Sequence, residues 1–252
     1  MSQRPAVAGP ACWLDVELPT VAENLALDEA LLVEAHESAT ASTVVRTWMA
    51  REPTVVLGSS SRGGDEVDFD ACRAAGVAVL RRPSGGLSVV LGPGCLMWTV
   101  VAAWPHPALA IDAIHAAVLD PLRESLRTAG RAVVRCGSSD LAIESRGGLR
   151  KVSGNALRVS RGFVLYHGTL LDAFDLPVIT RVLRHPPREP GYRAGRDHTE
   201  FLANLELGRR PLEDAVRRAF AADVRRTAWP QDRVANLLRD RYLDASWTDR
   251  IA

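Results

Sequence analysis

Lysine is almost absent from this sequence of 252 residues: 30 of its 31 basic residues are arginine, and the exception is Lys151. Arginine presents a planar fork that stays charged, whereas lysine is a compact point charge on a flexible stem. A site that needs a focused positive charge or a small amine cannot use arginine instead. The composition therefore makes Lys151 the first candidate functional residue.

Cysteine and long apolar runs are also scarce. The four cysteines are scattered singly, without a CxxC pair or metal-ligand spacing, at Cys12, Cys72, Cys95 and Cys136. This pattern indicates neither a zinc site nor a disulfide framework, and it is typical of a reducing compartment. No run approaches the ~18 apolar residues of a membrane span, and a charged segment followed by an apolar one is missing at the N-terminus. We therefore expect a cytoplasmic protein without a membrane segment.

An excess of charge of either sign is missing as well. The formal net charge is +1, and the contents of apolar residues (47%) and charged residues (24%) are ordinary for a globular protein. Nucleic acid is therefore not expected as a partner. We expect residues 1–10 to be a disordered lead and 11–252 to form a single domain, with 209–252 as a helical extension packed on it.

The hydrophobic pattern mixes strands and helices without a regular βαβ alternation, which indicates an α+β fold. Helices are predicted at 21–37, 68–75, 111–129, 176–183, 211–227 and 231–242. Strands are predicted at 43–49, 54–57, 77–80, 88–91, 95–101, 132–135, 140–144, 149–159 and 163–171. The Pro- and Arg-rich stretch 185–197 is predicted to be a long surface loop with a possible function.

The neighbours of Lys151 strengthen its candidacy. Ser153, Gly154 and Asn155 are small or able to hydrogen bond, and a glycine allows the backbone to approach a ligand closely. The returning strand carries a second polar position at His167. We therefore expect residues 150–156 and 167–171 to line one site.

A second informative stretch is the 81–86 loop, which begins with Arg81 and Arg82 at a strand end. It continues through Pro83 and Ser84 to Gly85 and Gly86. Two guanidinium forks beside free backbone N–H groups suit a carboxylate or a phosphate. The same strand–Gly-Gly–strand pattern also describes an ordinary hairpin.

Taken together, these stretches resemble the lipoate–protein ligase family and its octanoyltransferase relatives. The similar segments are collinear and comprise 24–29, 53–58, 81–86, 140–141, 150–156, 167–171, 204–205 and the tail that contains Trp247. The resemblance implies the catalytic-domain fold of biotin/lipoate protein ligases, with mixed, mostly antiparallel sheets and flanking helices. It covers about residues 12 to 250.

The resemblance also implies a reaction. Lipoate or octanoate is activated by ATP with Mg²⁺ as an acyl adenylate, and the acyl group then passes to a lysine of a lipoyl carrier domain. The implied acceptors are the carrier domains of 2-oxoacid dehydrogenase complexes and the glycine cleavage H protein. Acyl carrier protein is a possible further partner.

The resemblance assigns roles to the candidate residues. Lys151 is the catalytic cation, and it binds the nucleotide together with Asp140 and Arg82. The residues expected to bind the acyl substrate are Arg81, Arg82, Ser84, Gly85, Gly86, Ser153, Gly154, Asn155, His167 and Gly168. For His167, orienting the acyl group and simple packing are both open. No residue is predicted to ligate a metal.

The chain departs from the ligase pattern in the segment after the 81–86 loop. Leu87 replaces a third glycine, 91–92 replaces a His-Asp pair, and Cys95 stands at the position of an asparagine. Segment 91–96 resembles the Gly-Pro-Gly turn of octanoyltransferases, some of which form a thioester on a cysteine. If the protein is such a transferase, Cys136 is the candidate acyl carrier, whereas Cys95 is expected in the core.

Three functions therefore remain open. The first is an ATP-dependent ligase for lipoate or octanoate, and the second is an ATP-independent octanoyltransferase that acts through Cys136. The third is a non-catalytic module that binds or senses an acyl group. Biotin ligation is a weaker fourth, since 58–64 only loosely matches its loop. The sequence leaves the chain's preference for lipoate or octanoate, the acceptor and the oligomeric state undecided.

Overall fold

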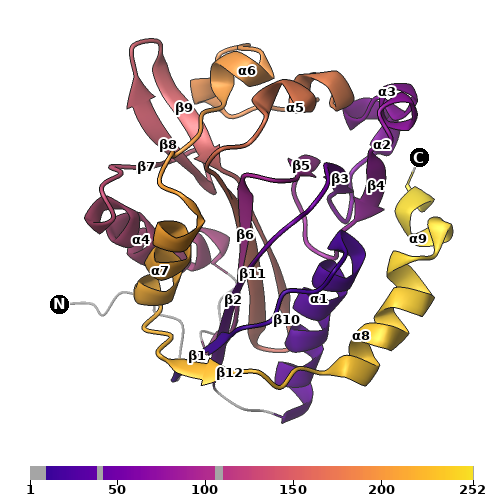
Figure 1. Cartoon of the computed structure of the whole chain (residues 1–252), viewed down its shortest axis with the longest axis vertical. Helices are drawn as coiled ribbons and strands as arrows, with labels where there is room; N and C mark the ends of the chain where they lie inside the picture. Colours follow the sequence, from indigo (N-terminus) through magenta and orange to yellow (C-terminus); the bar gives the residue numbers. More distant parts are fainter. Residues whose placement is uncertain (1–9, 39–41, 106–109, 252) are drawn as a thin grey trace.

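The computed structural model describes residues 10–38, 42–105 and 110–251 (Figure 1). Of the predicted disordered lead, residues 1–9 lie outside the described part. The main sheet contains, in spatial order, β10 (Asn155–Ser160), β11 (Phe163–Leu171), β6 (Cys95–Ala103), β2 (Thr43–Met49), β1 (Ala11–Leu14) and β12 (Val224–Arg226). β1 runs parallel to both of its neighbours, and the other pairs of this sheet are antiparallel.

Two small sheets flank the main one. The first has the order β4 (Ala78–Arg81), β3 (Thr54–Leu57), β5 (Val89–Leu91), and the second has the order β7 (Val134–Cys136), β8 (Asp140–Ser145), β9 (Gly148–Ser153). Their strands pair antiparallel except for β3 with β4. The predicted α+β class with mixed, mostly antiparallel sheets is confirmed.

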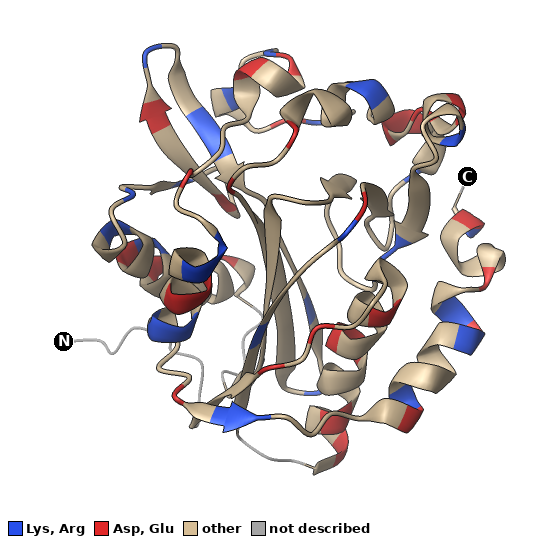
Figure 2. Cartoon of the chain, in the orientation of Figure 1, with Lys and Arg blue, Asp and Glu red and all other residues tan. Residues whose placement is uncertain are grey.

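The helices cover both faces of the main sheet and its edges. They are α1 (Val21–Ser38), α2 (Gly63–Glu66), α3 (Phe69–Ala74), α4 (Ile111–Thr128), α5 (Leu176–Val182), α6 (His198–Phe201), α7 (Arg209–Ala219), α8 (Gln231–Leu237) and α9 (Ala245–Asp249), with the short turns η1 (Gly191–Arg193) and η2 (Leu238–Tyr242). No helix in the described ranges is both long and apolar enough to cross a membrane. Figure 2 shows residues of both signs interspersed along α4, α7 and α8, in keeping with the small net charge.

The hydrophobic core has two parts, one on each face of the main sheet. Because side chains alternate along a strand, Met97 and Val101 of β6 pack into the cluster that contains α1, whereas Trp98 and Val100 pack into the cluster that contains α4 and α7. Both faces of β6 are thus buried. This explains why its sequence reads as one continuous apolar run.

Helix α1 begins with a capping box. The Thr20 hydroxyl accepts a hydrogen bond from the backbone N–H of Glu23 at 3.2 Å, and the Glu23 carboxylate accepts one from the backbone N–H of Thr20 at 2.7 Å. The cap sets the first turn, and the helix then lies against the main sheet. It brings two acidic residues, Asp28 and Glu29, into buried positions.

The predicted strand 149–159 is wrong as a single element. The chain leaves β9 at Ser153, passes Gly154 and enters β10 at Asn155, and the two strands belong to different sheets. Gly154 accepts a hydrogen bond at its carbonyl from the backbone N–H of Thr169 at 3.1 Å. This switch places Lys151 of the small sheet beside the end of the main sheet.

The predicted helix 211–227 is also wrong in its second half. Helix α7 ends at Ala219, and the chain reverses at Ala221, which has a φ of +48°. Val224–Arg226 then adds a strand parallel to β1, where Arg226 forms an ion pair with Glu34 at 2.8 Å. Pairing with the free edge of β1 therefore determined the structure of this segment, although its sequence pattern is helical.

The C-terminal helices pack on the rest of the chain. α8 and η2 lie along α1, and α9 contacts β4 (Figure 1). Glu29 of α1 is the central partner, since its carboxylate accepts hydrogen bonds from the Tyr242 hydroxyl at 2.8 Å and from the guanidinium groups of Arg158 and Arg241. These contacts bring residues 245–251 next to the end of β4.

Candidate active site

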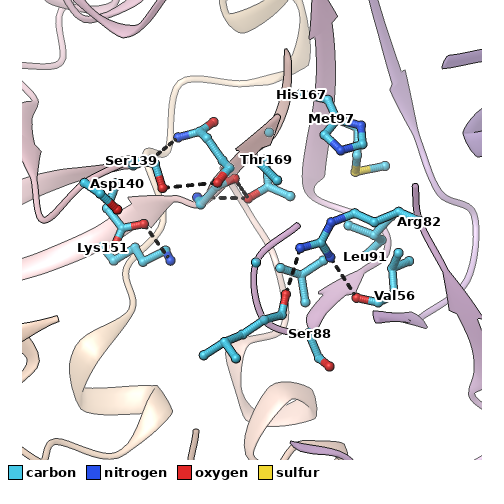
Figure 3. A pocket seen from close by; sticks show the side chains of 18 of the residues that line it. Val56, Arg82, Ser88, Leu91, Met97, Ser139, Asp140, Lys151, His167 and Thr169 are labelled. Atoms are coloured by element: carbon cyan, nitrogen blue, oxygen red, sulfur yellow. Dashed lines mark hydrogen bonds and ion pairs between the residues drawn. The ribbon is translucent and has the colours of Figure 1, made fainter. Parts of the chain in front are cut away.

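A cavity of about 600 Å³ lies between α1, the main sheet and the loops that follow β4 and α5. One group of lining residues is apolar and comprises Leu25, Trp48, Val56, Leu91 and Met97. In Figure 3, Lys151 and Asp140 lie on one side of the cavity, and His167, Met97 and Arg82 lie on the other. A cavity of this size with a few convergent polar groups is typical of a small-molecule site.

An ion pair between Lys151 and Asp140 lies in the lining of the cavity. Lys151 lies on β9 and Asp140 begins the neighbouring β8, and Lys151 Nζ is 2.8 Å from Asp140 Oδ1. The side chains are 25% and 12% exposed, so the amine is held in place but remains accessible from the cavity. The Lys151 amine can move to a negatively charged ligand, because it would have to break its contact with only one oxygen of Asp140.

Gly154 makes room for the lysine side chain. A Cβ atom at this position would lie 2.9 Å from Lys151 Nζ and 3.0 Å from its Cε. The side chain of Lys151 therefore crosses directly over Gly154. The absence of a side chain at Gly154 determines where the amine can lie.

Asn155 and Gly168 form a similar pair on the neighbouring strands. A Cβ atom at Gly168 would lie 1.7 Å from Asn155 Oδ1. The Asn155 amide donates to the carbonyl of Ser139 at 2.7 Å and so connects β10 to the loop before β8. Both residues line the cavity, whereas the predicted Ser153 is fully buried outside its lining.

Arg81 holds the loops together and does not line the cavity. Its guanidinium donates to the carbonyls of Gly58 at 2.7 Å and Ser61 at 2.8 Å, and its Nε donates to the carbonyl of Thr248 at 2.9 Å. Gly58 is itself in tight contact with the 81–86 loop, since a Cβ there would lie 1.8 Å from the carbonyl oxygen of Gly86. Arg81 thus connects this loop to the C-terminal helices.

Arg82 lines the cavity, but its donors are directed to three backbone carbonyls and to the Ser84 hydroxyl. The guanidinium donates to the carbonyls of Val56 at 3.1 Å, Gly85 at 2.6 Å and Leu87 at 2.9 Å, and its Nε donates to the Ser84 hydroxyl at 3.0 Å. Burial lowers the pKa of Arg82 to about 10, so the group is still charged at neutral pH. Because these donors are occupied, what the group offers to the cavity is its positive charge. Ser84 and Gly85 lie outside the cavity lining, whereas Gly86 is part of it.

His167 is part of a buried polar network. Its Nε2 lies 2.5 Å from the Ser84 hydroxyl oxygen, and its Nδ1 lies 3.4 Å from Asp28 Oδ2. Asp28 is also paired with Arg46 at 2.6 Å and accepts a hydrogen bond from the Thr99 hydroxyl at 2.9 Å. Burial acts to raise the pKa of Asp28, but the charge of Arg46 holds it below its ordinary value.

This network was missed by the sequence reasoning, although a signal was present. Asp28 interrupts an apolar helical face, and Arg46 interrupts an apolar strand. Charged residues are almost never fully buried unless they are paired. Two charged residues in two strongly apolar elements therefore predict a buried pair.

Cys136 lies at the end of β7, next to the cavity but outside its lining. Burial raises the pKa of its thiol, and the negative charge of Asp140 raises it further. Cys95 is fully buried, as predicted, and burial raises its pKa to about 12. None of the four cysteines, all within the described ranges, lines the cavity.

The predicted loop 185–197 does reach the site. It contributes four consecutive residues to the lining: Arg188, Glu189, Pro190 and Gly191. The loop is not structureless, since it contains the single turn η1. The hydroxyl of Tyr192 in this turn donates to Asp140 Oδ2 at 2.9 Å. Sequence reasoning did not single out Tyr192, because nothing local connects it to Asp140.

The chain resembles known proteins along most of its length. The family model of the lipoyl protein ligase A/B catalytic domain matches residues 20–223. The octanoyltransferase LipM of Kyrpidia tusciae is 26% identical, over 92% of this chain and 95% of the relative. Among solved structures, the bi-partite lipoate protein ligase of Thermoplasma acidophilum, studied with its E2 lipoyl domain, has a TM-score of 0.79 at 22% identity, with 98% of each chain covered. A lipoate-protein ligase A bound with ATP has a TM-score of 0.78 at 21% identity, over 97% of this chain and 100% of that one.

The fold and the site together define an α+β domain with a cavity of small-molecule size, whose lining contains one lysine. The chain belongs to the lipoyl protein ligase A/B catalytic domain family. It is an enzyme of the group that contains octanoyltransferases and lipoate–protein ligases. The non-catalytic module considered above is therefore the weakest of the three functions.

Proposed function

We propose that the protein is a lipoate–protein ligase that acts on lipoate or octanoate. In the first step the substrate carboxylate attacks the α-phosphate of ATP, which gives the acyl adenylate and pyrophosphate. In the second step the amine of a lysine on a lipoyl carrier domain attacks the acyl carbonyl, which gives an amide, AMP and a proton. The carrier domains of 2-oxoacid dehydrogenase complexes and the glycine cleavage H protein are the proposed acceptors.

The observation that carries this proposal is the position of Lys151. Its amine is the sole lysine amine of the chain, and it lies in a cavity where none of the four cysteines is present. Both steps develop negative charge on oxygen atoms of the phosphate or the acyl carbonyl, and a positioned cation stabilises that charge. Lys151 can supply this cation by leaving Asp140 Oδ1.

The remaining parts of the substrate have matching surroundings. The apolar group of Leu25, Trp48, Val56, Leu91 and Met97 suits a hydrocarbon chain. The charge of Arg82 and the Lys151 amine suit the phosphate. The described residues contain no cluster of three or more metal-ligating side chains. A Mg²⁺ ion would therefore be held mainly by the triphosphate.

The proposal is tested by the intact mass of a purified lipoyl domain after incubation with this protein. Lipoate or octanoate is supplied with and without ATP, and octanoyl-acyl carrier protein is supplied in parallel. An acyl mass shift that requires ATP supports the ligase. A shift from the carrier donor without ATP would move the assignment to the transferase.

Replacement of Gly154 by alanine is expected to lower acyl transfer roughly 10- to 100-fold, because a displacement of about 1 Å in a catalytic group has effects of this size. The new Cβ would push Lys151 Nζ away from its present position. The clash is with the end of a flexible side chain, so the melting temperature is expected to change little. Gly147→Ala is a suitable control, since nothing lies within 4 Å of its Cβ position. Wild-type activity of Gly154→Ala would contradict this role of the glycine.

The second candidate is an octanoyltransferase that receives the acyl group from acyl carrier protein and carries it on Cys136. It is favoured by the similarity to the LipM octanoyltransferase and by the position of Cys136 immediately before the cavity-lining Gly137. The raised pKa of the thiol opposes it, because the thiolate is the nucleophile.

For the ligase we expect Cys136→Ser to retain ATP-dependent transfer within about twofold of wild type, since surface-near substitutions outside a site have small effects. Labelling of the protein by octanoyl-acyl carrier protein, measured as a mass shift of the intact enzyme, provides the opposite test. A labelled wild type and an unlabelled Cys136→Ser would establish Cys136 as the acyl carrier.

A further inference from the structure

The carboxylate of Asp140 has two partners on its two oxygens. Lys151 Nζ lies 2.8 Å from Oδ1, and the Tyr192 hydroxyl donates to Oδ2 at 2.9 Å. The three residues come from three different segments: β8, β9 and the 185–197 loop. If the Lys151 amine moves away from Asp140, the Tyr192 hydroxyl can therefore stay bound to the other carboxylate oxygen.

Tyr192 is firmly anchored in its loop. Its ring packs against that of Phe201, with centroids 5.1 Å apart, and its backbone carbonyl accepts a hydrogen bond from Arg196 at 2.8 Å. Arg196 also donates to the carbonyl of Leu149 on β9 at 2.8 Å, which connects the loop to the strand of Lys151. Burial raises the pKa of the Tyr192 phenol, and the Asp140 charge adds to this effect. The hydroxyl consequently stays protonated and acts as a donor.

We propose that Tyr192 is a positioning residue for acyl transfer, which holds the Asp140 carboxylate when Lys151 moves from Asp140 to the reacting oxygen. The proposal rests on the function proposed above, in which Lys151 stabilises charge on the substrate. It goes beyond that function, because it assigns a role to a residue that does not itself contact the substrate.

The physical reason lies in what remains when the amine leaves. The Asp140 side chain is only 12% exposed, so its charge is poorly hydrated in the absence of Lys151. An uncompensated carboxylate would pull the amine back and oppose its transfer to the substrate. A hydroxyl donor on Oδ2 stabilises the carboxylate after the amine has left and keeps its other oxygen in place.

The first test is Tyr192→Phe, which removes the hydroxyl and keeps the ring. We expect kcat for transfer to a lipoyl domain to fall about tenfold, the size of effect expected for one hydrogen bond to a charged group. KM for the acyl substrate should change little. The matched control is Tyr242→Phe, since the Tyr242 hydroxyl also donates to a carboxylate, that of Glu29 at 2.8 Å, and both residues lie outside the cavity lining. Equal losses in the two variants, or a wild-type kcat in Tyr192→Phe, would overturn the proposal.

The second test asks whether Tyr192 acts through Asp140. In a double-mutant cycle, Tyr192→Phe is combined with Asp140→Asn, and thermal unfolding confirms that each variant is folded. A positioning role predicts that Tyr192→Phe has almost no further effect on kcat once Asp140 is neutralised. A tenfold loss that persists in the Asp140→Asn background contradicts it.

The Lys151→Ala variant distinguishes a failure of the proposed function from a failure of the role of Tyr192 alone. Full activity of Lys151→Ala would refute the proposed function and the role of Tyr192 together. A strong loss in Lys151→Ala combined with a wild-type Tyr192→Phe would leave the function in place and refute only the positioning role.

Discussion

Replacement of Lys151 by alanine is expected to lower acyl transfer to a lipoyl domain by about 10²–10³-fold, the usual cost of removing one donor that stabilises charge in a transition state. The loss should appear mainly in kcat, because the cation acts on charge that develops during the reaction. The measurement is the rate of the mass shift of the acceptor at saturating acyl substrate. Because Lys151 is the only lysine, the variant also removes the sole lysine amine of the enzyme that could itself become acylated.

Two companion variants define what Lys151 contributes. Lys151→Arg keeps the charge but replaces a compact amine with a planar fork, so it should remain strongly impaired. Arg150→Ala serves as the control, since the Arg150 guanidinium donates to the Thr199 carbonyl at 2.7 Å and lies outside the cavity lining. Equal activities of Lys151→Ala and Arg150→Ala would show that the amine has no catalytic role.

Replacement of Arg46 by methionine is expected to destabilise the fold by about 3–5 kcal/mol, because it leaves a buried carboxylate without its cation. Arg46 Nη1 lies 2.6 Å from Asp28 Oδ1, and the side chains are 0% and 2% exposed. A second donor of Arg46 bonds Asn24 Oδ1 at 2.6 Å, so its loss also leaves this amide oxygen without that donor. Denaturant unfolding measures the difference.

The difference in the free energy of unfolding between wild type and Arg46→Met is expected to depend on pH. In the wild type the pKa of Asp28 is held below its ordinary value, so the pair stabilises the fold above about pH 4 and this contribution is lost as the pH falls. In Arg46→Met the unpaired carboxylate can bind a proton more readily. The stability difference between the two proteins should therefore shrink on acidification. A difference that is constant with pH would indicate lost packing as the cause.

An exposed ion pair provides the control for the Arg46 variant. Arg225 Nη2 lies 2.6 Å from Asp15 Oδ2, but these side chains are 70% and 50% exposed. Arg225→Met should change stability by no more than about 1 kcal/mol. The same Arg→Met change is thus expected to have very different effects at a buried and an exposed pair.

Much of the site was predictable because its composition is unusual. The single lysine indicated Lys151 as a candidate, and the small residues around it indicated a close approach of the backbone to a ligand. The mixed pattern of strands and helices predicted the α+β class, which is confirmed. The local pattern predicted the wrong element at two places. At Gly154 one continuous segment divides between two sheets, and at 224–226 the segment pairs with the edge of a strand that is distant in sequence.

The two loop arginines show a second reason why the sequence did not predict the contacts of the site. Adjacent guanidinium forks beside a Ser-Gly-Gly turn predict anion binding, because free forks prefer oxyanions. In the structure the forks of Arg81 and Arg82 are occupied by backbone carbonyls from residues 56–61, 85–87 and 248–251. Which acceptor a guanidinium meets depends on segments that are distant in sequence.

From the sequence alone follow the fold class and the choice of Lys151 as the first candidate residue, since these depend on composition and local pattern. The tertiary structure decided the rest: the pairing of Lys151 with Asp140, the buried Asp28–Arg46 pair, the position of Cys136 outside the cavity and the contact of Tyr192 with Asp140. The physical reason is the same in each case. Ion pairs, hydrogen bonds and burial act over a few ångströms in space, and the residues that they join here can be more than fifty positions apart in the chain.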